Sequence, residues 1–191
     1  MRQMQPDGTL EASGLLARSY RSALGELSLL APLCARLTPA SARTISEPAG
    51  PMTWAPAGWV LETTALLLAV AGRDTCRSLG LKMSRDLAGG VLAPMAKTAL
   101  ALFGASPAAL YPRVQMYTAM VMRGIAIRYV PSDPRGGTLT LESDTAMNDG
   151  FLAVWEGVFL FAQEACGAKG GQVRPARLDP GGLRAHVSVS W

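Results

Sequence analysis

Apolar residues recur at helical spacing through most of the first 123 residues and at alternating positions in much of the remainder. The first helical stripe includes Leu16, Tyr20 and Leu24 and predicts a helix over about 13–30. The preceding residues, 1–12, are mostly polar, and we expect a flexible tail there. Residues 13–191 would then form a single domain.

Further helices follow from the same spacing. A short segment is expected from Pro32 to about residue 37, and the proline-rich stretch 38–56 reads as a surface loop. Glycines mark the ends of the later helices, and Ser106-Pro107 marks the start of one of them. These helices are expected over 56–72, 74–89, 91–103 and 106–123. Pro112 should kink the last of them.

At Gly124 the period of the pattern changes from helical to alternating. The order that follows is strand, strand, helix, strand, strand, over 125–130, 139–141, 150–166, 172–178 and 183–191. Asn148 or Asp149 is the expected N-cap of the helix, and Gly167 its end. The sequence therefore predicts an α+β fold. A helical N-terminal half packs on a four-stranded antiparallel sheet, which belongs to a ββαββ C-terminal unit.

Composition narrows the functional classes. The chain has 191 residues, 49% of them hydrophobic and 17% charged, which suits one domain with a real core. Its net charge of +4 comes from scattered residues without interleaved aromatics, so we expect no nucleic-acid partner. Glu62, Lys97 and Glu156 interrupt the longest apolar stretches, which excludes a transmembrane segment. The N-terminus lacks the apolar core of a secretory signal, and we expect a cytoplasmic protein.

The residue types that bind metals are few and dispersed. Cys34, Cys76 and Cys166 are widely spaced and odd in number, as expected for free thiols in a reducing compartment. His186, the single histidine, falls on the polar face of the last strand, which disfavours a catalytic or metal-binding role. We therefore expect neither a metal nor a cofactor.

The roles of Cys76 and Glu156 are each open to two interpretations. Cys76 lies between Arg73 and Arg77 near the predicted start of a helix, an environment that would lower the pKa of its thiol. The alternative that we favour is a small core residue. Glu156 is either a buried carboxylate facing a ligand or, the interpretation that we favour, part of an outward face shared with Leu160 and Gln163.

The closing part of the chain resembles a known superfamily. The resemblance rests on Gly150-Phe151-Leu152, on Trp155-Glu156-Gly157-Val158 and on the terminal Val-Ser-Trp. Upstream it is supported by the segments 79–83, 102–107 and 123–124. The superfamily groups haem-NO-binding domains with 4-vinyl-reductase-like domains and small TRAPP subunits. Within it, the chain looks most like a family of similar length known chiefly from myxobacteria.

The resemblance implies a helical half packed on a four-stranded sheet, with an apolar pocket between them. Haem-binding members use a proximal histidine on a helix, whereas this chain has only His186 in its last strand. The 4-vinyl-reductase-like members bind zinc through a cysteine cluster near the C-terminal helix, where this chain has only Cys166. Some TRAPP-like members carry an acyl chain on a cysteine, and Cys76 lies shortly before Lys82-Met83, the nearest match to their motif.

These observations favour a non-enzymatic sensor or adaptor domain that binds a small apolar molecule or an acyl chain. Flexible methionines and large aromatic side chains suit such a pocket. The pocket candidates are Cys76, Met83, Met116, Met120, Trp155 and Phe159. We expect a homodimer or another protein partner. The first alternative is a dimeric protein–protein interaction module with a filled core, and the second is an enzyme that uses Cys76 as its nucleophile.

Overall fold

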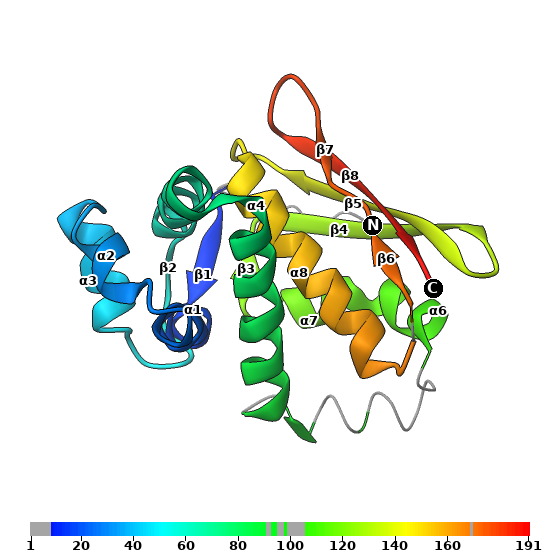
Figure 1. Ribbon diagram of the computed structural model, residues 1–191, viewed down its shortest axis with the longest axis horizontal. Helices are drawn as coiled ribbons and strands as arrows, with labels where there is room; N and C mark the ends of the chain where they lie inside the picture. Colours follow the sequence, from blue (N-terminus) through cyan, green and yellow to red (C-terminus); the bar gives the residue numbers. More distant parts are fainter. Residues whose placement is uncertain (1–8, 91–92, 95–97, 99–105, 169) are drawn as a thin grey trace.

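The computed structural model describes residues 9–90, 93–94, 98, 106–168 and 170–191. Figure 1 shows the N-terminal helices on one side of the molecule and a long twisted sheet on the other, with helices α4 and α8 between them. The predicted α+β class is confirmed, although the number and limits of several elements differ from the prediction.

A small three-stranded sheet ties distant parts of the chain together. It consists of β1 (Glu11–Ser13), β2 (Trp54–Pro56) and β3 (Met122–Arg123), in the order β2-β1-β3. Ala12 of β1 and Leu10, directly before this strand, are buried. The predicted flexible tail is therefore wrong for residues 9–12, because partners more than forty positions away supply the strand pairing.

Three short helices precede the central one. These are α1 (Gly14–Glu26), α2 (Leu30–Cys34) and α3 (Pro39–Ser46). The first helix ends before residue 30, and Ser28 adopts a positive φ of 58° just beyond it. The expected loop over 38–56 is wrong: the Thr38 hydroxyl accepts a hydrogen bond from the Ser41 amide, and Pro39 occupies the first turn of α3.

Helix α4 spans Gly58–Gly89 and contains a kink. At Gly72 the backbone leaves the helical region (φ 79°, ψ 175°), and helical geometry resumes directly after it. The predicted stop at Gly72 and the restart near Asp74 are thus confirmed. Most of the helix predicted over 91–103 lies outside the described residues.

The helix predicted over 106–123 is much shorter than expected. Ser106 caps α6 (Pro107–Leu110), as predicted, but Pro112 falls in the 3₁₀ turn η1 (Tyr111–Arg113) that follows. Helix α7 (Val114–Thr118) completes the segment, and the chain then enters β3. A proline lacks the amide donor that a continuous α-helix needs, which explains the break.

The large antiparallel sheet has five strands rather than four. They are β4 (Ile125–Asp133), β5 (Gly136–Ser143), β6 (Gln172–Val173), β7 (Arg177–Leu178) and β8 (Arg184–Ser190). The order is β4-β5-β8-β6, and β7 also pairs with β8. The additional strand arises because the strand predicted over 172–178 is interrupted at 174–176, so both of its halves pair separately with β8.

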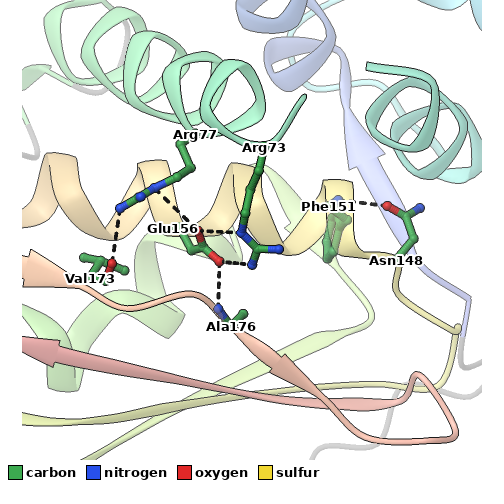
Figure 2. Close-up of polar contacts among 7 residues, drawn as sticks. All are labelled: Arg73, Arg77, Asn148, Phe151, Glu156, Val173 and Ala176. Carbon is green, nitrogen blue, oxygen red and sulfur yellow. Dashed lines mark hydrogen bonds and ion pairs between the residues drawn. The ribbon is translucent and has the colours of Figure 1, made fainter. Parts of the chain in front are cut away.

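Helix α8 (Asp149–Ala165) lies between α4 and the sheet (Figure 1). Asn148 is its N-cap, and the side-chain oxygen of Asn148 accepts a 2.9 Å hydrogen bond from the Phe151 amide (Figure 2). Its end at Cys166 and Gly167, where φ is 69°, is as predicted.

Glycines allow α4 and α8 to pack closely. A Cβ atom on Gly80 would collide with the carbonyl oxygen of Val154, and a Cβ atom on Gly157 would collide with that of Arg77. Both glycines therefore lie where the two helix backbones approach most closely. The two closely packed helices carry several of the side chains described next.

Candidate functional site: an apolar cavity

A cavity of about 340 Å³ lies among helices α1, α4, α7 and α8. Its wall includes Leu16 and Tyr20 of α1, Met83 of α4, Val114 of α7 and Trp155 of α8. No described residue of this wall is an Asp, Glu, Lys, Arg or His. The size falls in the range of about 300–1,000 Å³ that is typical of small-molecule sites.

The structure brings three of the six sequence-predicted pocket residues together. Met83, Met120 and Trp155 all line the cavity. Met116 is 47% exposed and does not line it, so its prediction as a lining residue is wrong. Phe159 and Cys76 are fully buried in the surrounding core without lining the cavity. The ligand-binding role of the three lining residues stays a prediction.

The sequence interpretation missed the contribution of the tyrosines to the wall, namely Tyr20, Tyr111 and Tyr117. The ring of Tyr20 packs edge-on against Trp59, with centroids 5.1 Å apart. The ring of Tyr111 stacks on Tyr129 at 5.5 Å. Helical periodicity identified Tyr20 as a buried position, but no local signal separates a cavity wall from a filled core.

The polar atoms of the wall are mostly used within the protein. The Tyr111 hydroxyl donates a 3.0 Å hydrogen bond to the Phe159 carbonyl, and the Thr118 hydroxyl donates to the Val114 carbonyl at 3.0 Å. The Tyr117 hydroxyl is buried and has no hydrogen-bond partner among the described residues. Burial raises the pKa of Tyr111 and of Tyr117. The described wall is therefore uncharged at neutral pH.

Cys76 occupies the core rather than a reactive position. Its side chain is fully buried, and burial raises the pKa of its thiol to about 11. The charge of Arg73 acts in the opposite direction but is outweighed. This is contrary to the lowered pKa that a nucleophilic Cys76 would need, and it supports the interpretation as a small core residue. All three cysteines are free.

Glu156 is fully buried, so the favoured outward orientation is wrong. Its carboxylate forms ion pairs with Arg73 and, at 3.4 Å, with Arg77, both on α4 (Figure 2). It also accepts a 2.7 Å hydrogen bond from the Ala176 amide, while Arg77 donates to the Val173 carbonyl at 3.1 Å. The buried carboxylate therefore joins two helices to the segment between β6 and β7, and its partners are arginines instead of a ligand.

The single histidine of the chain lies outside the cavity wall. His186 is on the exposed face of β8, as predicted, with its Nδ1 atom 3.2 Å from the Thr140 hydroxyl. The described residues contain no group of three or more His, Cys, Asp or Glu side chains arranged to hold a metal ion. In the same part of the chain, no helix has the length and apolarity needed to cross a membrane.

Comparison with known proteins gives a similarity of fold at low sequence identity. No family model and no curated protein matches the chain. Among solved structures, the Fe(II) unliganded H-NOX protein from K. algicida is 8% identical, with 93% of this chain and 95% of that chain covered and a TM-score of 0.64. A structure from work on haem distortion in the H-NOX family is 11% identical over 94% of each chain, with a TM-score of 0.66.

An oxygen-binding H-NOX domain related to soluble guanylate cyclases is also similar. It is 9% identical, with 90% of this chain and 89% of that chain covered and a TM-score of 0.58. The chain thus has an H-NOX-like fold, which supports the haem-NO-binding part of the resemblance seen in the sequence. Similarity to 4-vinyl-reductase-like domains and to TRAPP subunits stays a prediction.

Proposed function

We propose that this protein is a non-enzymatic sensor or adaptor domain that binds a small apolar molecule in the cavity between α1, α4, α7 and α8. The observation that carries the proposal is the cavity itself, which has the volume of a small-molecule site and an uncharged, mainly apolar wall. The fold supports it, because the similar proteins are described as haem-containing or oxygen-binding H-NOX domains.

Binding in such a cavity depends mainly on burial of apolar surface. Each buried methylene group contributes about 0.8 kcal/mol, so a ligand that fills the space gains affinity without many hydrogen bonds. Met83, Met120 and Trp155 provide adaptable and aromatic surface for these contacts.

The described wall of the cavity lacks the residue type that most commonly binds haem iron. Haem requires an axial ligand for its iron, and in haem proteins this is commonly a histidine. The single histidine, His186, lies on the exposed face of β8, and no described wall residue is a histidine or a cysteine. The described wall also offers no cation for the haem carboxylates. The proposed ligand is therefore an organic molecule, and the proposal involves no iron chemistry.

The environment of Cys76 supports the non-enzymatic part of the proposal. The enzyme alternative required a reactive thiol, whereas burial raises the pKa of Cys76 to about 11. Dimerisation and a cytoplasmic location remain predictions from the sequence.

The test compares two variants that make the same chemical change inside and outside the cavity. Ala162→Leu adds volume to the wall on α8, and Ala119→Leu adds it at an exposed position after α7. Binding is followed by the fluorescence of N-phenylnaphthylamine, an uncharged apolar dye. We expect saturable binding to the wild type and to Ala119→Leu, and a loss of at least about tenfold in affinity for Ala162→Leu.

Mass spectrometry of the purified protein complements this test. A mass excess present under native conditions and absent after denaturation would identify a carried ligand. Absence of dye binding to the wild type, together with a bare native mass, would reject the proposal in favour of the interaction module with a filled core.

A further inference from the structure

We infer that the cavity selects an uncharged lipophilic molecule, such as an alcohol, ester or hydrocarbon, over the corresponding carboxylate. This inference rests on the proposed function and specifies the chemical class of the ligand. It follows from the distribution of charge around the cavity.

The described wall has no group that is charged near neutral pH. Its titratable side chains are Tyr20 from α1 and Tyr111 and Tyr117 from the η1–α7 segment. Burial raises the pKa of all three, so their hydroxyls stay protonated well above pH 7. The other described residues, from α4, β3 and α8 among others, are apolar except for Ser84 and Thr118.

Two cations on α4 pair with carboxylates outside the cavity wall. On α4, Lys82 pairs with Glu26 at 2.7 Å. Arg85 pairs with Glu164 of α8 at 2.7 Å. None of these residues lines the cavity.

Three further arginines also have partners within the protein. Arg73 and Arg77 pair with the buried Glu156. Arg113 of η1, whose charge acts on Tyr117, donates to the Ala109 carbonyl at 2.6 Å and is not part of the wall. A carboxylate in the cavity would therefore lose its hydration without gaining a cationic partner from the described wall.

A carboxylic acid would consequently bind only in its protonated form. Because that form becomes tenfold rarer with each pH unit above the pKa of the acid, the apparent affinity should fall by about tenfold per unit. An alcohol of the same length carries no such penalty, and its affinity should not depend on pH. The difference in pH dependence is a direct measure of the charge selectivity of the cavity.

The experiment measures displacement of N-phenylnaphthylamine by decanol and by decanoic acid between about pH 5.5 and about pH 8. We expect a flat profile for decanol and a decrease of about tenfold per pH unit for decanoic acid. Equal, pH-independent affinities for both probes would overturn the inference while leaving the proposed function intact. Dye binding that neither probe displaces would overturn the inference as well, and absence of dye binding together with a bare native mass would overturn both.

A charge added to the wall should reverse the selectivity. Ala88 of α4 lines the cavity near the end of the helix, where a long side chain can extend towards solvent. Ala88→Lys should bind decanoate at least about tenfold more tightly than the wild type near pH 8, because the ammonium group pairs with the carboxylate. Ala88→Met, similar in length but uncharged, is the matched control and should keep the preference for decanol. Equal decanoate affinities of the two variants would contradict the inference.

Discussion

The carboxylate of Glu156 and the guanidinium of Arg73 form an ion pair that crosses from α8 to α4 just after the Gly72 kink. Glu156 is fully buried, whereas the side chain of Arg73 keeps about a third of its surface exposed. Glu156 directly follows Trp155, which lines the cavity, and it also binds the Ala176 amide beyond β6. One turn of α8 thus supports both the cavity wall and the segment between β6 and β7.

We expect Arg73→Ala to lower the free energy of unfolding by about 3 kcal/mol, because it leaves a buried carboxylate with a single, longer ion pair to Arg77. Arg85→Ala is the control, since Arg85 and Glu164 form an exposed pair worth at most about 1 kcal/mol. Urea denaturation followed by tryptophan fluorescence measures both. Equal effects of the two substitutions would show that the Glu156 network contributes no more than a surface pair.

The close approach of α4 and α8 leads to a second prediction. A methyl group on Gly157 would meet the Arg77 carbonyl oxygen, a backbone atom that cannot move without shifting α4. Gly157→Ala should therefore destabilise the protein by about 2–3 kcal/mol through overpacking, despite the higher helix propensity of alanine.

The control for this prediction is Gly25→Ala. Gly25 lies in the last turn of α1, and no neighbouring atom comes within 4 Å of the position that an added methyl group would occupy. Here the propensity effect acts alone, and we expect a change between zero and about 1 kcal/mol of added stability. Thermal melts distinguish the two cases. A Gly157→Ala protein as stable as the wild type would mean that the helices are farther apart than the structure indicates.

Much of this fold could be predicted because its signals are local. Alternation identified β4, β5 and β8, and the Asn148 cap and Gly167 defined α8 almost to the residue. The misplaced elements depend on distant partners. Strand β1 exists only because β2 and β3 pair with it, and α3 begins at Pro39, a residue that reads equally well as part of a turn.

The site was less predictable because a cavity depends on how distant parts of the chain pack together. Met83 and Met116 are alike in the sequence, yet one lines the cavity and the other is 47% exposed. Glu156 was assigned to a solvent-facing side because an amphipathic helix usually has one. Residues 150–157 of α8 have no such side, because all of them are buried between α4 and the sheet (Figure 1). The arginines that neutralise Glu156 are about eighty positions away.

The three thiols should differ in reactivity. Cys76 is fully buried with a pKa of about 11, so about one thiol in a thousand is ionised at pH 8. Cys34 and Cys166 are only partly buried. We expect iodoacetamide to modify these two in the native protein and Cys76 only after unfolding in urea, as measured by peptide mass spectrometry. Rapid native alkylation of Cys76 would restore the nucleophile hypothesis.

The raised pKa of Cys76 also predicts a loss of stability at alkaline pH. The folded protein holds the thiol proton up to about pH 11, whereas the unfolded chain releases it near its ordinary pKa of 9.0. Folding therefore retains protons between these values, and stability must fall as the pH rises through that window, by about 2 kcal/mol for this group. Below about pH 9 its contribution is complete. The raised pKa of Tyr20 acts in the same direction at higher pH, since its phenol is buried beside the thiol.

The variant Cys76→Ala should remove the part of the decline in stability that begins near pH 9 and keep the part due to tyrosine. Urea denaturation at a series of pH values can resolve the two parts. A wild-type curve that stays flat to pH 11, or one that Cys76→Ala leaves unchanged, would contradict the assignment of this thiol to the core.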